Sequence, residues 1–336
     1  MGYTLNLCKT RISDVPYNQN LRKRRNKYGT EQSSDETVKR VQQELERSGY
    51  IPNMAGILLA RNNSRIIGVV VNDNEKYEGR VLEDGFVMAS INALSHEVNE
   101  KGYFLMIKTT SDISEIPVFA SMWNMDGLIL MGFCEADYEK LRNQMRISFV
   151  VYDGYFEKCS KVVNLVINHY DGGYQAGKYF RGLGHKKALC IADNFICMDK
   201  ERIEGFSEAF EPGETLRWEI PKTEKERMCF YEDKYQTLLK NNVTAVFAVS
   251  DFYALEFMRF LQGKDIQIPK DIQIIGFDDN MASRESHPSL TTIHQEAPLR
   301  AKTAIKCLEA MRDGAECETE IVLPVELIKR ESTGEL

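Results

Sequence analysis

The sequence predicts an α/β fold of two similar lobes, each built on a parallel sheet, behind a small helical segment at the N-terminus. From about residue 66, short apolar runs rich in β-branched residues alternate with amphipathic stretches, which is the pattern of βαβ units. This alternation restarts near residue 170, so two sheets are expected. A length of 336 residues suits two or three domains.

The first set of elements runs from residue 66 to about residue 152. Ile66–Val71 is a continuous apolar run, as expected for a strand buried on both faces of a parallel sheet. Apolar residues then recur at helical spacing over 84–101. The other elements predicted here are strands at 103–107, 127–131 and 149–152 and helices at 114–123 and 135–145.

The second set begins with a helix and predicts the second lobe. Its helices are expected at 170–183, 200–210, 224–240 and 251–261, and its strands at 188–192, 215–220, 245–249 and 272–277. Ligands of such sheets bind at the carboxyl ends of the strands. Two facing lobes therefore predict a polar cleft lined by loops from both.

The segment before the first lobe has a different pattern. Ser34 is expected to begin a helix as its N-cap, and Val38, Val41 and Leu45 lie on one face of that helix. Met54–Arg61 could form a second, shorter helix. Because about eight residues are marginal as an isolated helix, this one would need a partner.

Charge is distributed unevenly along the chain. The 43 Lys and Arg residues against 50 Asp and Glu give a net charge of -7, which argues against a dedicated nucleic-acid binder. Residues 1–30, however, hold seven Lys or Arg and a single Asp, so this segment carries +6 and the remainder -13. Two interpretations stay open: a solvated basic arm, or a segment that binds phosphates.

The sequence predicts a cytoplasmic protein that has neither a metal nor a cofactor and does not bind membranes. No apolar run approaches the roughly 18 residues that a membrane span requires, and no secretory signal is visible at the N-terminus. The eight cysteines are scattered, without Cys-x-x-Cys or zinc-ligand spacing, and are expected to be reduced thiols.

No catalytic constellation is visible, and an enzyme is not expected. The chain has neither a G-x-S-x-G nor a G-x-x-x-x-G-K-[ST] motif. Asp278 and Asp279 do not indicate a hydrolase, because adjacent strand-end carboxylates point in different directions.

Over residues 34–336, about nine-tenths of the chain, the sequence resembles the LacI/GalR family of bacterial transcription regulators. Each motif is weak alone, and their common order and spacing carry the resemblance. The matching runs are Ser34–Val41, Gly49–Asn53, Ile67–Val70, Asp126–Leu130, Gly184–Lys187, Arg202–Phe206, Thr244–Ala248, Ile268–Pro269, Ile274–Asp279, Pro288–Ile293 and Arg330–Thr333.

The resemblance implies two periplasmic-binding-protein-like lobes behind a DNA-binding headpiece. Residues 1–61 would be the headpiece and hinge helix, and 62–336 the effector-binding domain. Lobe 1 would comprise about 66–166 and 296–325, and lobe 2 about 167–293 and 326–336. The chain would cross between lobes near 166–168, 293–296 and 325–327.

The headpiece departs from the family pattern. Between Ile12 and Asn26 there is no Ala-Gly-Val-Ser turn and no Thr-Val-Ser recognition helix, and Pro16 would interrupt the first helix. We therefore hypothesise an incomplete headpiece that lacks a working recognition helix. Its basic arm could still bind phosphates without choosing a sequence.

The hinge carries the other DNA contacts that the resemblance implies, which are Leu59, Asn53, Ala55 and Arg61. Leu59 matches a leucine that such hinges insert into a minor-groove base step, which kinks the duplex. The alternative is that Leu59 packs the linker against a lobe.

The effector contacts that the sequence and the resemblance predict are Asp278, Arg202, Asp153, Asn72, Asn74 and Ser250. Asp278 and Arg202 match residues that bind sugar hydroxyls, and Ser250 stands where an asparagine is common. Carboxylate and guanidinium groups suit hydroxyl-rich ligands because charge-assisted hydrogen bonds are strong. The alternative for each residue is a helix cap or an interlobe ion pair.

Neighbouring residues complete the predicted cleft. Asp251 is expected to cap the helix that follows it. Tyr77, Phe252 or Trp218 could stack on the face of a sugar.

Two functions remain open from the sequence. The first is a ligand-responsive, DNA-binding transcription regulator, a repressor, that senses a sugar or nucleoside and acts as a homodimer on a two-fold operator. The second is a cytosolic small-molecule sensor of the same fold without sequence-specific DNA binding.

Overall fold

A computed structural model describes residues 35–49, 64–133, 138–156 and 161–334 of the chain. The chain divides after Asn63 into two units, which are described separately. The predicted hinge helix at 54–61 and the headpiece residues 12–26 lie outside the described residues. So do the predicted DNA contacts Asn53, Ala55, Leu59 and Arg61.

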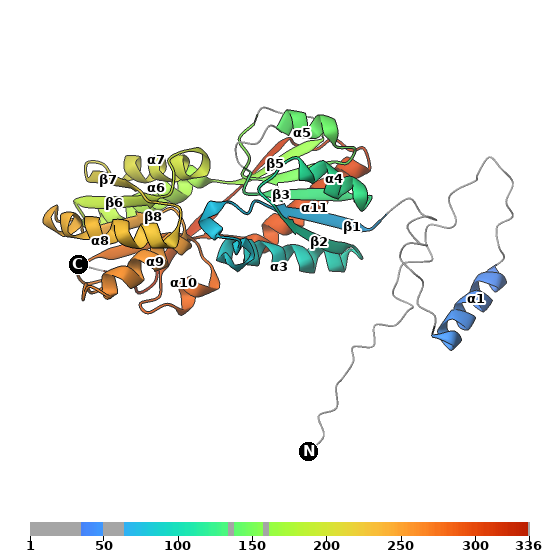
Figure 1. Ribbon diagram of the computed structural model, residues 1–336, viewed down its shortest axis with the longest axis horizontal. Coiled ribbons are helices and arrows are strands. Elements are labelled where there is room, and N and C mark those ends of the chain that lie inside the picture. The colour runs from blue at the N-terminus through green and yellow to red at the C-terminus, as the bar shows by residue number, and fades with distance from the viewer. Residues whose placement is uncertain (1–34, 50–63, 134–137, 157–160, 335–336) are drawn as a thin grey trace, which may run out of the picture. The chain divides into compact units, whose positions relative to one another are not determined.

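The first unit contributes one described helix, α1 (Asp35–Ser48), drawn in blue in Figure 1. It confirms the helix that the apolar spacing predicts. Gly49 follows it with a φ of 64°, the left-handed conformation that commonly ends helices. Val41, on the apolar face, is 52% exposed.

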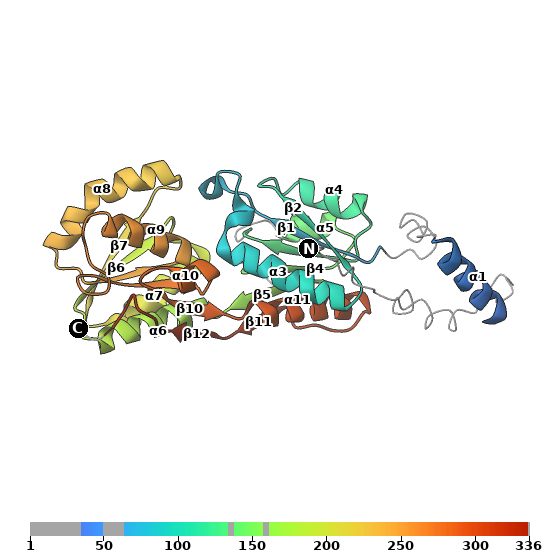
Figure 2. The same cartoon turned by 90° about the horizontal axis from the view of Figure 1, so that it is seen from below.

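The second unit contains two six-stranded sheets (Figures 1 and 2). The strand orders are β11-β5-β4-β3-β1-β2 and β12-β10-β9-β8-β6-β7, with every neighbouring pair parallel except β10–β12. The predicted α/β class with two mostly parallel sheets is confirmed.

The first sheet and its helices form lobe 1. Its elements are β1 (Ile66–Val71), the 3₁₀ turns η2 (Glu75–Tyr77) and η3 (Val81–Glu83), α3 (Gly85–Glu100), β2 (Phe104–Thr109), α4 (Glu115–Met122), β3 (Gly127–Met131), α5 (Tyr138–Gln144), β4 (Phe149–Tyr152), β5 (Val162–Ile167), α11 (Ala297–Arg312) and β11 (Glu320–Leu323).

The second sheet and its helices form lobe 2. Its elements are α6 (His169–Gly182), β6 (Lys187–Ala192), α7 (Cys197–Phe210), β7 (Glu214–Glu219), α8 (Glu224–Lys240), β8 (Ala245–Ala248), α9 (Asp251–Gln262), β9 (Gln273–Asp278), α10 (Met281–Glu285), β10 (Thr291–Gln295) and β12 (Val325–Ile328).

The strands and helices predicted between residues 66 and 277 are present, with ends that differ by up to three residues. The apolar runs do not predict β5, nor any element beyond β9. Among the described helices, none is both long and apolar enough to cross a bilayer.

Burial on both faces explains the continuous apolar sequence of β1. Alternate residues of the strand enter two separate cores: Val69 lies in the core beneath α3 and α11, and Val70 lies in the core beneath α4. Figure 2 shows α3 and α11 on one side of the sheet and α4 on the other. Because side chains alternate along a strand, both faces require apolar residues here.

Small residues let α6 and α7 pack backbone to backbone in lobe 2. A Cβ added to Gly173 would lie 1.8 Å from the carbonyl oxygen of Arg202, and one added to Gly205 would lie 2.0 Å from that of Tyr170. Neither position can accept a side chain without moving a helix. This close packing brings the beginning of α6, with His169, next to Arg202 on α7.

Three connections join the lobes. Asn168 lies between β5 and α6, Glu296 between β10 and α11, and Pro324 between β11 and β12. Residues close to two of these connections belong to the site described next.

Candidate functional site

Most of the predicted effector contacts lie where strands end. Asp153 follows β4, Ser250 follows β8 and Asp278 is the last residue of β9. Asn72 follows β1 and Arg202 comes from α7. Direct contacts between the lobes occur in the same region, for example between Gly85 at the start of α3 and the Asn280 side chain.

Arg202 is buried, and its guanidinium lies over an aromatic ring. Its guanidinium carbon is 3.7 Å from the centroid of the Phe277 ring. Nη1 donates to the carbonyl oxygen of Val249 at 2.5 Å, and Nε donates to Nδ1 of His169 at 3.2 Å. These partners fix the orientation of Arg202 beside the end of β9, next to the candidate contact Asp278.

His169 links Arg202 to Asp153. Because Nδ1 of His169 accepts from Arg202, Nε2 carries the proton and donates to Oδ1 of Asp153, 2.9 Å away. Burial lowers the pKa of His169 to about 4, against the opposing effect of Asp153, so the imidazole is neutral.

Asp153 is buried and all its bonds are internal to the chain. Oδ1 accepts from His169 and from the backbone N–H of Ile167, and Oδ2 lies 2.8 Å from Nη2 of Arg300. Burial alone would raise the pKa of Asp153, but the charge of Arg300 and the hydrogen bond from His169 outweigh it and hold the pKa well below its usual range. Asp153 therefore forms an ion pair with Arg300 within lobe 1 and accepts a hydrogen bond from His169 of lobe 2.

Arg300 and Gln295 carry the chain of contacts across the connection between β10 and α11. Nη1 of Arg300 donates to Oε1 of Gln295 at 3.2 Å. Nε2 of Gln295 then donates to Oδ1 of Asp278 at 2.8 Å. A continuous series of bonds, which we call the interlobe network, therefore joins Asp278, Gln295, Arg300, Asp153, His169 and Arg202.

Of the two acids in the network, Asp278 has fewer bonding partners within the chain than Asp153. Burial raises its pKa well above the ordinary value; Arg202 opposes this shift and Asp251 adds to it. Its φ of 125° is unusual for a residue with a side chain, and its carboxylate accepts from Gln295. Asp279 instead pairs with Arg330 at 2.5 Å and with Arg284 at 3.0 Å. The expectation that the two carboxylates point differently is confirmed.

The beginning of α9 differs from the sequence prediction. Ser250, not Asp251, is the N-cap, and its hydroxyl accepts from the backbone N–H of Tyr253 at 3.4 Å. The prediction that Asp251 caps this helix is wrong. Its carboxylate is fully buried and accepts from the Thr292 hydroxyl at 2.5 Å and from the backbone N–H of Asn280 at 3.0 Å. Burial raises the pKa of Asp251 to about 7.

The two predicted asparagines of lobe 1 are partly engaged. Nδ2 of Asn72 donates to the carbonyl oxygen of Gly132 at 2.8 Å, while its Oδ1 is buried without a partner. Asn74 caps η2 by accepting from the backbone N–H of Lys76 at 3.2 Å. Asn72 therefore retains an acceptor atom for a ligand.

Of the aromatic residues considered for stacking, Trp218 belongs to the core of lobe 2. Its ring packs edge-on against Phe230 and Phe257, with centroids 5.6 and 5.9 Å away. Tyr77 instead lies beside groups of the cleft, because Asp84 and Asp278 both influence its hydroxyl.

The sequence analysis missed five residues that contribute to the cleft, which are Lys76, Asp84, Asp193, Asp199 and Tyr253. Asp84 is the N-cap of α3, Asp193 follows β6 and Asp199 lies in the first turn of α7. The usable signal was the position of Asp193 directly after a strand. Lys76 carried no such signal, because only the 3₁₀ turn places it there.

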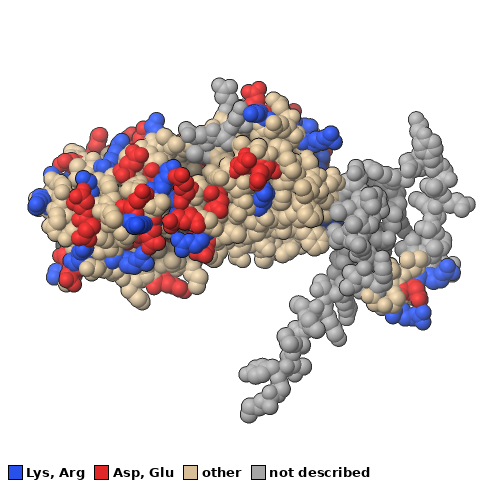
Figure 3. Space-filling model, viewed as in Figure 1, with Lys and Arg blue, Asp and Glu red and all other residues tan. Residues whose placement is uncertain are grey.

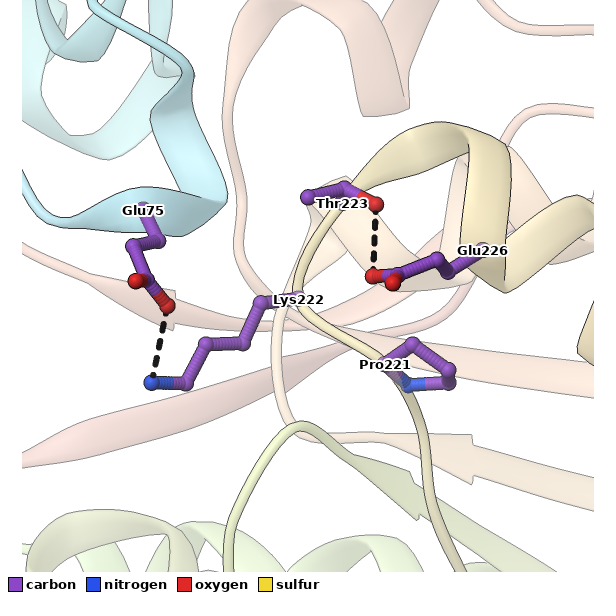
Figure 4. Close-up of a pocket in the computed structure, with 5 residues that line it drawn as sticks. All are labelled: Glu75, Pro221, Lys222, Thr223 and Glu226. Atoms are coloured by element: carbon purple, nitrogen blue, oxygen red, sulfur yellow. Dashed lines mark hydrogen bonds and ion pairs between the residues drawn. The ribbon is translucent and has the colours of Figure 1, made fainter.

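An open hollow of about 650 Å³ lies between the lobes and is lined by Glu75, Pro221, Lys222, Thr223 and Glu226. In Figure 4, Glu75 of lobe 1 faces Lys222 from the loop before α8, and their charged atoms are 3.3 Å apart. None of the predicted effector contacts lines this hollow. In the part of the chain that the structure describes, no cluster of His, Cys, Asp or Glu is arranged to hold a metal ion.

Comparison with known proteins gives consistent results. Residues 178–333 match the family model described as a periplasmic binding protein-like domain. The chain is 29% identical over 312 residues to the HTH-type transcriptional repressor PurR of Pasteurella multocida (strain Pm70), covering 88% of this chain and 90% of that protein.

Two solved structures show the same fold. The Lac repressor dimer bound to operator and the anti-inducer ONPF superposes with a TM-score of 0.74 at 20% identity, over 90% of this chain and 92% of that one. The complex of the transcriptional regulator CelR with cellobiose superposes with a TM-score of 0.70 at 21% identity, over 91% of this chain and 93% of that one.

Proposed function

We propose that this chain, which belongs with the LacI/GalR family of transcriptional regulators, is a ligand-responsive DNA-binding repressor. The observation that carries the proposal is the interlobe network. A ligand that contacts Asp278 and Arg202 touches both ends of a bonded series that runs through the connections between the lobes. Ligand binding is thereby coupled to the arrangement of the lobes.

The effector is a small, hydroxyl-rich molecule bound by Asp278, Arg202, Asn72 and Ser250. The cellobiose complex of CelR supports this class of ligand. Asn74 has a capping role and Asp153 holds the network, so both position the site. Tyr77 stacks on the ligand.

The ligand acts by favouring one arrangement of the lobes over the other. The free energy of this shift equals the difference between the ligand's binding free energies for the two arrangements. By linkage, DNA binding must alter effector affinity by the same factor as the effector alters DNA binding.

Residues 1–61 form the headpiece and hinge, and residues 62–336 the effector domain. The basic segment 1–30 approaches the phosphates, while Asn53, Ala55, Leu59 and Arg61 contact the minor groove. The protein works in the cytoplasm, where its operator is.

The active form is a homodimer. Lobe 1 exposes apolar side chains near one another in the sequence: Val118 is 59% exposed, Met122 71% and Trp123 45%. Figure 3 shows few charged side chains over much of lobe 1, in contrast to the dense charges on lobe 2. The dimeric Lac repressor structure supports this assembly.

A second function, a sensor without sequence-specific DNA binding, is favoured by one observation. Residues 12–26 lack the turn and the recognition helix that family members use to read bases. In this alternative the basic arm binds DNA only through its charge.

The test is an in vitro selection of duplex DNA with the full chain, followed by fluorescence anisotropy at two salt concentrations. A repressor binds the selected duplex at least about a thousandfold more tightly than a scrambled one. Leu59→Ala should weaken binding to the selected duplex. Equal affinity for both duplexes, with a steep salt dependence, would establish the sensor instead.

A further inference from the structure

The ammonium group of Lys76 lies between tyrosines of the two lobes. Nζ is 4.8 Å from the centroid of the Tyr77 ring in lobe 1 and 5.8 Å from that of Tyr253 in lobe 2. Both distances are within the range at which an aromatic face attracts a cation. The cleft thus contains a place that fits an ammonium group and currently holds one from the chain itself.

Carboxylates from both lobes surround this place. Asp84 of lobe 1 and Asp193 of lobe 2 both stabilise the charged form of Lys76. Nδ2 of Asn194 lies 3.1 Å from Oδ1 of Asp193 and 3.1 Å from Oδ2 of Asp199, which holds these two acids together. Among the described residues, no carboxylate forms a direct ion pair with Lys76. The acids therefore retain acceptor capacity for another donor.

Tyr253 provides an independent indication of a ligand. Its side chain is 1% exposed, and its hydroxyl is buried without a hydrogen-bond partner. Lys76, Asp193 and Asp199 are among the charged groups that influence this hydroxyl, so it lies near these groups. A buried hydroxyl without a partner is costly, and a polar ligand group beside it removes that cost.

The balance of charged groups around Lys76 indicates the sign of the ligand's charge. Four carboxylates influence this region (Asp84, Asp193, Asp199 and Asp278), against the cations Lys76, Arg202 and Arg227, and Arg227 is already paired with Glu256 at 2.7 Å. Arg202 is already engaged with the Val249 carbonyl oxygen and His169. Burial raises the pKa of Asp199 to about 6, and Asp193 adds to this rise against the opposing charge of Arg202. An anionic ligand would face further repulsion, while a cationic one would relieve it.

We propose that the effector is a hydroxylated amine, such as an amino sugar, whose ammonium group takes the place of Lys76 Nζ between Tyr77 and Tyr253. The inference rests on the proposed function only in taking this cleft as the effector site. The ligand's hydroxyls bind Asp278 and Arg202, and its ammonium binds Asp193 and Asp199. Lys76 moves out toward solvent, where its charge is hydrated at no cost.

Lys76 is then a built-in competitor of the ligand. Removing its charge should therefore strengthen the binding of an amine. The same change should weaken the binding of an acidic ligand, because such a ligand would use Lys76 as its partner.

The test is a thermal-shift and calorimetric titration of the full-length protein with sugars matched in ring and differing in charge. The probes are glucosamine, galactosamine and mannosamine, each beside its neutral parent and its uronic acid. We expect at least one amino sugar to bind at least about tenfold more tightly than its neutral and acidic counterparts, a difference of about 1.4 kcal/mol.

Three variants report the site. Lys76→Met should raise the affinity for the amino sugar several-fold, and Asp193→Asn should lower it about tenfold. Lys240→Met, which removes an exposed charge at the end of α8, is the matched control and should leave the affinity for the amino sugar unchanged. If one variant does not fold, the other still reports the sign of the interaction.

Several results would overturn the inference. They are the absence of binding by any amino sugar, a preference for the neutral or acidic member of a set, or a loss of affinity in Lys76→Met. None of them bears on the proposed repressor function, which the DNA titration tests separately. A neutral sugar that binds and alters DNA affinity would retain the proposed function and reject the amine.

Discussion

Oδ1 of Asp153, at the end of β4 in lobe 1, lies 2.9 Å from Nε2 of His169, at the beginning of α6 in lobe 2. Both side chains are buried, and the connection at Asn168 lies between them in the sequence. The pair therefore fixes the first crossing of the chain between the lobes. Arg300 completes its charge balance from α11.

Asp153→Asn should destabilise the protein strongly. The substitution removes the negative charge that compensates Arg300, which is 2% exposed. Leaving a buried charge without its partner typically costs about 3–5 kcal/mol of the free energy of unfolding. Urea denaturation at pH 7 measures this loss. Asp313→Asn is the control: its carboxylate is 67% exposed beside Arg312, so no measurable loss is expected. Equal stabilities of the two variants would contradict the role assigned to Asp153.

Because of the His169 imidazole, the protein should become less stable as the pH falls from about 6.5 to about 4. The folded-state pKa is lowered to about 4 from 6.5, chiefly by burial. In this window the unfolded chain binds a proton that the folded chain does not, so acid favours unfolding. His169→Gln keeps a donor and an acceptor but cannot titrate.

The measurement compares the free energy of unfolding of the wild type and His169→Gln from pH 7.5 to 4.5. The wild type should lose up to about 3 kcal/mol relative to the variant on acidification. Asp199 and Asp251, whose pKa values burial raises to about 6 and about 7, act in the opposite sense. They are present in both proteins and cancel in the difference. A constant difference across this pH range would show that His169 does not titrate as inferred.

The sequence predicts the strands that are buried on both faces better than the rest of the fold. β1 and β3 are continuous apolar runs because apolar cores cover both sides of the sheet. β11 and β12 are four-residue strands with exposed positions, and they are separated only by Pro324. β11 pairs with β5, which lies more than a hundred residues earlier in the chain, and β12 pairs with β10. No local sequence pattern indicates these pairings.

The candidate site was predicted as a set of residue types, but not as a network. Asp278 and Arg202 were identified by resemblance. The sequence does not reveal that Arg202 bonds to His169, because the close packing of α6 on α7 creates that contact. Lys76 was missed for a similar reason. Its position beside Tyr253 exists only when the lobes are together.

Gly85 should be required for the lobes to come together. A Cβ at this position would lie 2.7 Å from Cβ of Asn280, which is closer than real Cβ atoms approach. Gly85→Val should therefore hold the lobes apart, with a larger radius of gyration in small-angle scattering and weaker effector binding. Ala89→Val, at an exposed position of the same helix, is the control. Asn280→Ser keeps an N-cap for α10 and should partly rescue Gly85→Val. An unchanged radius of gyration in Gly85→Val would show that the contact is dispensable.

Met122→Glu should weaken self-association. Met122 is 71% exposed on α4 beside Val118 and Trp123, so the substitution places a charge in the proposed dimer interface without entering a core. Burying an unpaired carboxylate between subunits is costly, and we expect the dimer dissociation constant to rise at least about tenfold. Sedimentation velocity across a concentration series measures this change. Leu239→Glu, on α8 of lobe 2, replaces a side chain that is 38% exposed and should leave the dimer intact. If Leu239→Glu dissociates the dimer and Met122→Glu does not, the interface lies on lobe 2 instead.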